Sequence, residues 1–370
     1  MTFPLAPYRS TMSSLSVEAV RTAIEAYPDP ESGRPIGSMD QIRDVVVSGA
    51  SSTTITIGLT SHSMPIADEV ADALRSRIVA AIPGTDVDVQ TVHHDRAPAR
   101  LGQIGLRCKS VIAVGSGKGG VGKSTVAASL ALTLRRMGSK VGLMDADVYG
   151  PSIPHLLGLS GRPAITEAKR IEPIRCGDMP VMSMGFLIEP DQAVIWRGPM
   201  LHGSINQFLG ETDWGDLDYL IIDMPPGTGD IALTLSQALP LAGSVVVCTP
   251  QEVALLDAVK AISMFRKVNI PILGMVENMS GFLCPDCGKT YDIFGRGGAR
   301  DKAEELGVAY LGGLPIDIEL RKAGDEGRLA EVIDTDERAR APFDAVAKAV
   351  VRNLAAKAAA APPKASLPTL

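Results

Sequence analysis

The chain has 370 residues, of which 45% are hydrophobic and 21% are charged, and its formal net charge is −6 at pH 7. These values are typical of a globular protein with one large domain and one small one. The acidic balance argues against a protein that binds nucleic acid through bulk electrostatics, so we expect no nucleic-acid partner. No apolar run reaches the roughly 18 residues of a membrane-spanning helix, and residues 1–4 do not open a signal peptide. We therefore expect no membrane partner.

Five cysteines are few, and odd in number, for a chain of this length. This usage favours a reducing compartment, where cysteines are free, catalytic or metal-bound, and we expect a cytoplasmic protein. Cys108, Cys176 and Cys248 stand alone in apolar or strand-like contexts, and we expect them to be small buried hydrophobic side chains. The remaining two, Cys284 and Cys287, form a close pair.

Residues 1–95 predict a small α/β domain with the element order α-β-β-α-β. Apolar residues recur at helical spacing over 17–26 and 66–82, and β-branched or alternating stretches at 42–48, 54–59 and 86–89 predict strands. The unit resembles the small domain, related to metal–sulfur cluster assembly proteins, that often precedes the ATPase in one P-loop family. That family commonly has a cysteine before the proline of its second helix, whereas this chain has Met64. We expect Met64 to be a packed side chain, with a thioether ligand as the alternative.

Residues 96–108 predict a linker, because Ala-Pro and Gly punctuate them. His93 and His94 precede this linker. Neighbouring side chains on an extended segment point in opposite directions, so we expect a solvated pair and not a metal site.

Residues 109–357 alternate between predicted strands and helices. Apolar strands are predicted at 111–114, 141–144, 217–222, 244–248 and 272–276, and helices at 124–137, 200–209 and 253–268. This alternation predicts an α/β fold with a doubly wound, mostly parallel P-loop NTPase sheet and with ligands at the carboxyl ends of its strands. Residues 358–370 predict a disordered tail, and a helix from Glu337 extends into the Ala-rich stretch that begins at Ala355.

The stretch 117–124, with the sequence GKGGVGKS, fits the G-x-x-x-x-G-K-[ST] phosphate loop and lies between a predicted strand and a predicted helix. Glycines allow backbone N–H groups to surround phosphate oxygens at a helix N-terminus. Lys123 is expected to reach the β- and γ-phosphates, and Ser124 to bind Mg²⁺. The expected ATP-binding residues of this segment are Gly117, Lys118, Gly119, Gly120, Val121, Gly122, Lys123, Ser124 and Thr125.

A second lysine, Lys118, gives the loop a form that resembles the deviant Walker A class of P-loop ATPases. In that class the extra lysine crosses a dimer interface to the partner's nucleotide. The resemblance thus implies an ATP-dependent homodimer in which Lys118 and Lys123 are both catalytic. The alternative is an ordinary solvated loop lysine.

Polar residues at the ends of three other predicted strands complete the expected nucleotide site. Asp223 opens a DMPPG segment typical of Walker B and switch II, where the carboxylate holds a water of the Mg²⁺ shell and the Gly227 N–H senses the γ-phosphate. By resemblance to the class, Asp147 orients the attacking water and Asp145 supports the metal shell, although both residues could instead cap a helix. Asn278 resembles the adenine-contacting residue of the class.

The pair Cys284 and Cys287 lies in a loop flanked by Gly and Pro. A CxxC pair can be a redox centre, half of a zinc site or half of an iron–sulfur site. One pair is two thiolates short of a Cys₄ site, and a homodimer with the loop near its two-fold axis would supply all four. A redox pair usually opens a helix near the start of its domain, so we rank redox third. Spare cysteines or a structural clip remain alternatives.

Together these motifs resemble the Mrp/ApbC family of iron–sulfur cluster carrier ATPases over nearly the whole chain. The match also includes DADVYGPS at 145–152, WRGPM at 196–200, DYLIIDMPPGTGD at 218–230 and ENMS at 277–280. The resemblance implies an ATP-hydrolysing homodimer that binds a labile cluster, of the 4Fe–4S type, between its two subunits and transfers it to client apoproteins. A MinD/ParA-like spatial-organising ATPase without a cluster is the alternative, and an iron-protein-type reductase is a third interpretation.

Overall fold

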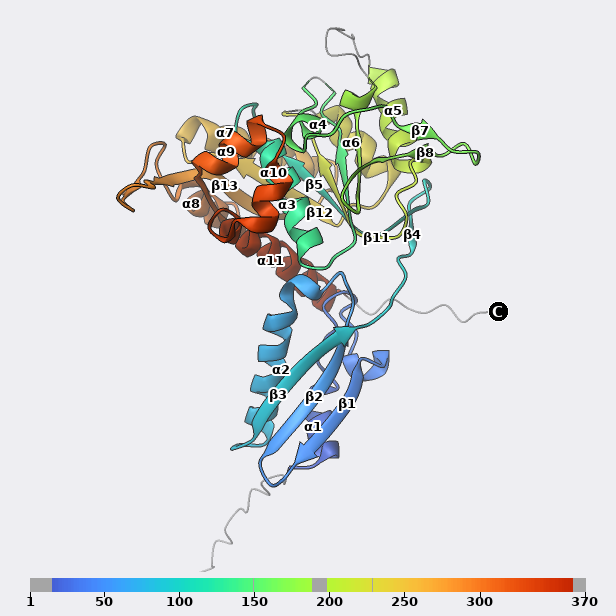
Figure 1. The fold of residues 1–370 in the computed structure, drawn as a ribbon, viewed down its shortest axis with the longest axis vertical. Coiled ribbons are helices and arrows are strands. Elements are labelled where there is room, and N and C mark those ends of the chain that lie inside the picture. The colour runs from blue at the N-terminus through green and yellow to red at the C-terminus, as the bar shows by residue number, and fades with distance from the viewer. Residues whose placement is uncertain (1–14, 149, 188–197, 228, 362–370) are drawn as a thin grey trace, which may run out of the picture. The chain divides into compact units, whose positions relative to one another are not determined.

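The computed structural model describes residues 15–148, 150–187, 198–227 and 229–361 (Figure 1). The chain forms two compact units, one made of Met1–Asp95 with Ala355–Leu370 and the other of Arg96–Leu354. The predicted domain boundaries stay predictions. The first four residues, Trp196 and Arg197 of the WRGPM segment, and residues 362–370 of the predicted tail lie outside the described residues. Within the described ranges, every helix is too short or too polar to cross a membrane.

Between Val17 and His93, the N-terminal unit contains a three-stranded sheet, two α-helices and two short 3₁₀ helices, which are labelled η. Its elements are α1 (Val17–Ile24), η1 (Ile36–Met39), β1 (Ile42–Ser48), β2 (Ser52–Leu59), η2 (Met64–Ile66), α2 (Ala67–Ala81) and β3 (Asp86–His93). β2 lies in the middle, antiparallel to β1 and parallel to β3. Val70, Leu74 and Ile78 recur every four residues on one face of α2 and are buried. The predicted order α-β-β-α-β is confirmed.

The larger unit alternates strands and helices. Its elements are β4 (Arg100–Leu101), β5 (Leu106–Gly115), α3 (Lys123–Arg136), β6 (Val141–Asp145), α4 (Ile153–Leu156), β7 (Ala164–Ile165), β8 (Ile171–Glu172), β9 (Ile174–Cys176), β10 (Met179–Ser183), η3 (Met184–Phe186), α5 (Gly198–Glu211), β11 (Leu217–Asp223), α6 (Gly229–Ala238), β12 (Gly243–Cys248), α7 (Glu252–Lys267), β13 (Ile272–Leu283), β14 (Thr290–Tyr291), α8 (Gly298–Glu305), β15 (Tyr310–Ile316), α9 (Ile318–Asp325), α10 (Leu329–Thr335) and α11 (Glu337–Ala360). The predicted strands and helices of this region are all present.

A ten-stranded sheet forms the centre of the larger unit, with helices packed against it (Figure 1). The main strand order is β14-β13-β12-β5-β11-β6-β10-β9, with β15 paired to β13 and β4 paired to β5. Six of the nine strand pairs are parallel, and the antiparallel ones involve the short strands β4, β9 and β14. β6, β11 and β12, and β5 from Ser110 onward, are buried on both faces, and their sequences there are mostly apolar. The predicted α/β fold with a mostly parallel sheet is confirmed.

β13 differs most from its prediction. The sequence predicts a strand over 272–276 that ends before Glu277 and Asn278, whereas β13 continues to Leu283. The extension pairs with β14 and β15, so partners distant in sequence maintain a strand through polar residues and through Gly281. Both Glu277 and Asn278 therefore lie within a strand and not in the turn after it.

The last turns of α11 belong to the N-terminal unit. Gly33 lies in a turn of that unit with φ +70°, and a Cβ atom there would be 2.1 Å from the carbonyl oxygen of Ala358. Only glycine allows both the left-handed backbone and this close approach. α11 also continues two residues past 358, where the predicted tail begins, because its sequence there is still Ala-rich.

Candidate functional site

The phosphate loop connects β5 to α3. Gly120 and Gly122 both have φ +79°, a backbone conformation that glycine adopts without strain. A Cβ atom on Gly117 would be 2.0 Å from the carbonyl oxygen of Asp257 in α7, so the loop needs glycine there as well. A cavity of about 290 Å³ opens at the loop; its lining includes Lys118, Gly119, Gly120, Gly122, Lys123, Ser124, Thr125, Asp147 and Pro226. Val121 is buried beneath it.

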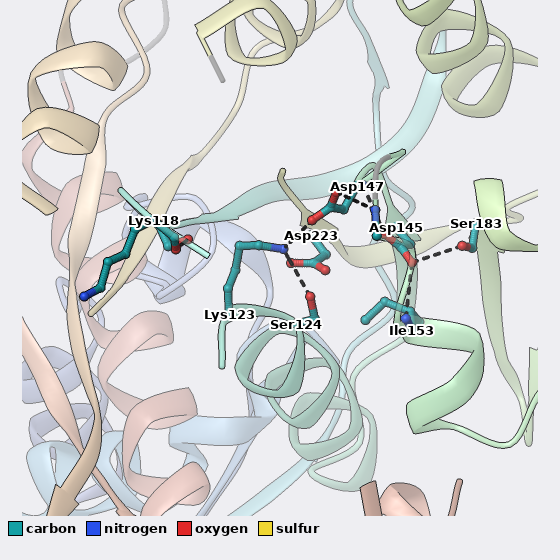
Figure 2. Close-up of polar contacts among 10 residues, drawn as sticks. Lys118, Lys123, Ser124, Asp145, Asp147, Ile153, Ser183 and Asp223 are labelled. Atoms are coloured by element: carbon teal, nitrogen blue, oxygen red, sulfur yellow. Dashed lines mark hydrogen bonds and ion pairs between the residues drawn. The ribbon is translucent and has the colours of Figure 1, made fainter. Parts of the chain in front are cut away.

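The Lys123 ammonium lies at the centre of the site (Figure 2). Its Nζ is 2.5 Å from Asp223 Oδ1, 3.1 Å from Ser124 Oγ and 3.6 Å from Asp147 Oδ2. Only 6% of the Lys123 side chain is exposed, so these carboxylates compensate a charge that has lost most of its hydration. The structure thus brings together four residues that the sequence predicts for phosphate, Mg²⁺ and water. Phosphate groups that enter the loop compete with Asp223 for the ammonium.

The donors around Lys123 suit Mg²⁺. Burial raises the pKa of the Asp223 carboxyl, and the neighbouring Lys123 opposes this shift. Asp223 Oδ2 is buried and accepts no hydrogen bond from the residues that the structure describes. This oxygen, the Ser124 hydroxyl and the Asp147 carboxylate are hard oxygen ligands of the kind that Mg²⁺ prefers, and they can also accept hydrogen bonds from waters bound to Mg²⁺. The assignment of Ser124 and Asp223 to Mg²⁺ remains a prediction with compatible chemistry.

Asp145 is fully buried and already holds several donors. Its carboxylate accepts hydrogen bonds from the Asp147 N–H at 3.1 Å, the Ile153 N–H at 3.2 Å and Ser183 Oγ at 3.0 Å (Figure 2). Burial, with the Asp223 carboxylate as a second cause, raises its pKa to about 8. Asp145 therefore fixes the loop that carries Asp147 to the start of α4, as the helix-capping alternative expects. Ser183 was not predicted, because nothing local marks a serine in a buried strand as its partner.

Three further predicted residues surround the loop. Figure 2 shows the Lys118 side chain directed away from Lys123 and the aspartates, an orientation that fits both a lysine acting on a partner's nucleotide and a solvated loop lysine, so its role stays a prediction. The Gly227 N–H donates to the Ser116 carbonyl at 3.1 Å, so the switch II segment touches the phosphate loop. Asn278 Nδ2 donates to the Val121 carbonyl at 2.8 Å. Its predicted contact with adenine stays a prediction.

The cysteine pair lies in the hairpin between β13 and β14. The Cys284 N–H donates to the Lys289 carbonyl at 3.0 Å, and the Gly288 N–H donates to the Cys284 carbonyl at 2.9 Å. Cys284 is half-buried and Cys287 is exposed. Backbone N–H groups of Cys287 and Asp286 lower the pKa of the Cys284 thiol, which favours the thiolate needed for a metal ligand.

Within one chain this pair provides two thiol groups. Across the described residues, no group of three or more His, Cys, Asp or Glu side chains is arranged to hold a metal ion. The other three cysteines are buried as predicted, and burial raises the pKa of Cys108 and of Cys248 to about 12. They are therefore small core side chains and not available ligands.

Other predicted positions have structural explanations. Met64 is half-buried in η2. His94 Nδ1 lies 2.7 Å from an Arg43 guanidinium nitrogen, and His93 Nδ1 lies 3.8 Å from an Asp95 carboxylate oxygen. The two imidazoles thus have separate partners.

Comparisons with known proteins agree with the geometry. A family model described as "NUBPL iron-transfer P-loop NTPase" matches residues 107–351, and one described as "Iron-sulfur cluster assembly protein" matches residues 17–91. An "Iron-sulfur cluster carrier protein" of Synechocystis sp. is 42% identical over 348 residues, covering 91% of this chain and 97% of the relative. One of Deinococcus radiodurans is 43% identical over 343 residues, covering 92% and 96%. The solved structure of a nucleotide-binding protein from Archaeoglobus fulgidus in complex with ADP is 44% identical, with a TM-score of 0.54, over 61% of this chain and 89% of that one.

Proposed function

The chain belongs to the family of NUBPL-type iron-transfer P-loop NTPases, and we propose from this membership that it hydrolyses ATP and carries a labile iron–sulfur cluster to apoproteins. The cluster is its cargo, not a resident cofactor. The observation that carries the proposal is the pair formed by the half-buried Cys284 and the exposed Cys287, directly after β13, a strand that also touches the phosphate loop through Asn278. A spatial-organising ATPase has no use for such a pair.

The nucleotide part of the proposal assigns one task to each polar residue. Loop N–H groups and Lys123 bind the phosphates, while Ser124 and Asp223 hold Mg²⁺ or its waters. Mg²⁺ supplies positive charge that neutralises the developing negative charge. Asp147, which lines the cavity and lies 3.6 Å from Lys123 Nζ, orients the attacking water. The Gly227 N–H changes partner from Ser116 to the γ-phosphate, which makes switch II sensitive to hydrolysis.

The proposed active form is a homodimer. Two observations support it: Lys118 points away from its own site, and one chain contributes two thiolates to a cluster that takes four (Figure 2). Two hairpins facing each other across a two-fold axis supply the Cys₄ set of a 4Fe–4S cluster. A cytoplasmic location belongs to the same proposal, because reduced thiols persist there.

The proposal is tested by anaerobic reconstitution with iron and sulfide. Wild-type protein is compared with a Cys284→Ala/Cys287→Ala double variant and, as a matched control, with a Cys176→Ala/Cys248→Ala double variant of buried cysteines. A broad thiolate-to-iron charge-transfer band is expected in the wild type and the control but not in the hairpin variant. Absence of the band from all three proteins would overturn the carrier proposal and favour the organising ATPase.

A further inference from the structure

Both ends of the cysteine-bearing segment are held by one carboxylate, that of Glu277. Its Oε1 accepts hydrogen bonds from Ser280 Oγ at 2.5 Å and from the Gly297 N–H at 2.9 Å, and its Oε2 accepts one from the Ala299 N–H at 2.8 Å. Ser280 precedes Cys284 by four residues, and Gly297 follows Cys287 by ten. Glu277 therefore closes the base of the loop that carries both cysteines.

The charge of Glu277 is compensated by backbone. The side chain is fully buried, and Gly297 and Ala299 belong to the N-terminus of α8, where unpaired N–H groups carry partial positive charge. Hydrogen bonds to an ionised acceptor are stronger than neutral ones. The position of α8 and the end of the cysteine loop thus depend on this carboxylate, because leaving these donors without an acceptor in a buried place is costly.

The next residue along β13 connects to the nucleotide site. Asn278 Nδ2 donates to the Val121 carbonyl, and a Cβ atom on Gly122 would be only 2.2 Å from that same nitrogen. Side chains of neighbouring strand residues point to opposite faces. One dipeptide of β13 therefore holds the phosphate loop on one side and the base of the cysteine loop on the other.

The strand is irregular immediately after this dipeptide. Met279 has φ +59° and Gly281 has φ +79°, and the pairing of β13 with β15 shifts register between Asn278 and Phe282. Such an irregularity disrupts the ladder locally and bends the strand. Beyond it, Phe282 still pairs with Ile316 of β15, so the bend after Asn278 sets the direction in which the hairpin leaves the sheet.

We propose that Glu277 is a positioning residue that, together with Asn278, couples occupancy of the phosphate loop to the orientation of Cys284 and Cys287. The inference rests on the proposed carrier function and gives it a physical connection between ATP and cargo. In this coupling, phosphate binding shifts the Val121 carbonyl, and Asn278 moves with it through their hydrogen bond. The neighbouring Glu277 then moves both ends of the cysteine loop through its hydrogen bonds to Ser280 and Gly297. By linkage, a metal held by the cysteines changes nucleotide affinity by the same factor as nucleotide changes metal affinity.

The test measures the alkylation of each cysteine by iodoacetamide in the full-length protein, with and without Mg·ATP, followed by mass spectrometry. The thiolate attacks the reagent and iodide leaves, so the rate reports thiolate accessibility without any cluster. Glu277→Gln keeps the shape of the side chain but presents an NH₂ group to a backbone N–H. Asp218→Asn is the control, because Asp218 is also a buried carboxylate that accepts from backbone; it lies at the amino end of β11 and also pairs with Lys109.

In the wild type and in Asp218→Asn, Mg·ATP is expected to change the alkylation rate of Cys284 or Cys287 by about fivefold or more. In Glu277→Gln the ratio should approach one, with the affinity for ATP kept within about twofold of wild type. A ratio in Glu277→Gln equal to that of wild type would overturn the proposal. Wild-type alkylation rates that are the same with and without Mg·ATP would also overturn it. An equal loss of the response in Asp218→Asn would overturn it as well, because the loss would then reflect a general decrease in stability.

A milder variant covers the case in which Glu277→Gln fails to fold. Ser280→Ala removes one of the three hydrogen bonds and leaves Glu277 its two backbone donors, so an intermediate response is expected. An unchanged response in Ser280→Ala, with Glu277→Gln unfolded, would count against the proposal. If the carrier function itself is wrong, the charge-transfer band will be missing from reconstituted wild type. The alkylation experiment can still be interpreted in that case, because it needs no cluster.

Discussion

The phosphate loop and the cysteine hairpin both leave the same sheet at the carboxyl ends of strands, yet they are built in opposite ways. Around Lys123 the charges are buried and compensated within one chain, because Asp223 and Asp147 lie within 4 Å of its ammonium. In the hairpin, Cys284 is half-buried, Cys287 is exposed, and the pair provides two ligands where a cluster takes four.

This difference separates a site whose charges are balanced within one chain from a pair of ligands that, in our proposal, a second chain completes. The core strands β5 and β11 determine the positions of Lys123 and Asp223, so the contact between these two side chains is formed before anything binds. The cysteines depend on a single strand, β13, and on the contacts at its base. Substitutions in the nucleotide site should therefore change ATP hydrolysis and the stability of the fold. Substitutions in the cysteine hairpin should change cluster binding.

The largest expected effect comes from Lys123→Ala. Removing the ammonium that binds the phosphates should lower ATP hydrolysis by roughly a hundredfold or more, as loss of a key charge-stabilising donor does. Cluster uptake should stay near that of wild type, because the cysteines lie in a separate hairpin. Phosphate release and the charge-transfer absorption are measured on the same preparation. Lys260→Ala, a change at an exposed lysine of α7, is the control. Lost cluster uptake in Lys123→Ala would mean that the two regions are not separable.

Burial in the nucleotide site also predicts a pH dependence. The pKa of Asp145 is raised to about 8, so its stabilising contribution is complete below the ordinary carboxyl value of 3.8 and is lost as pH rises through about 8. Between pH 6 and 9, without Mg²⁺ or nucleotide, the free energy of unfolding of wild type should fall by roughly 2 kcal/mol more than that of Asp145→Asn. Urea denaturation at several pH values measures this difference. Parallel curves would show that Asp145 is ionised throughout the range.

Lys118→Ala tests whether the nucleotide site is complete for catalysis. Its side chain points away from its own site, so folding should be unaffected, while ATP-dependent activity should fall by about tenfold, as for loss of a charge that stabilises the transition state. Mixing Lys118→Ala with Lys123→Ala subunits should restore part of the activity, since each mixed dimer then has one intact site. Activity of Lys118→Ala equal to that of wild type would argue against catalysis across the dimer.

Asn278→Ala should give the smallest effect, because it removes one hydrogen bond to the phosphate loop. A loss of about 1 kcal/mol corresponds to a roughly fivefold higher Kd for ATP. Titration with a fluorescent ATP analogue measures the change, and Asn353→Ala, which loses a side-chain hydrogen bond to the Leu273 carbonyl, is the control. If ATP binding is unaltered, the contact with Val121 has no part in nucleotide binding, and β13 connects to the loop in some other way.

Local sequence was sufficient for the phosphate loop. Its glycines, Lys123 and Ser124 are contiguous, and the flanking strand and helix follow from the spacing of apolar residues, so β5 and α3 were predictable. Asp223 is a hundred residues away, but its motif follows an apolar strand, and parallel strands bring their carboxyl ends together. The contact between Lys123 and Asp223 follows from these two facts.

The contacts of the cysteine loop were not predictable in this way. Glu277 reaches Gly297 and Ala299 across twenty residues of irregular chain, and no periodic pattern encodes that distance. The only local signal is one acidic residue at the end of an apolar stretch, which also fits a turn. The short strands β7 to β10 were not predicted for a similar reason. Each has only two to five residues, too few to show a pattern, and forms a strand because it pairs with a neighbouring strand.

The turn at Gly33, closed against Ala358, has a consequence for the order of events during synthesis. Chains emerge from the ribosome N-terminus first, and domains generally fold as they emerge. Here the first unit to emerge lacks its last piece until residues 355–360 are made, more than 250 residues later. A chain that stops before Ala355 therefore lacks a part of both units, and the nascent N-terminal unit is completed only after the larger unit has been made.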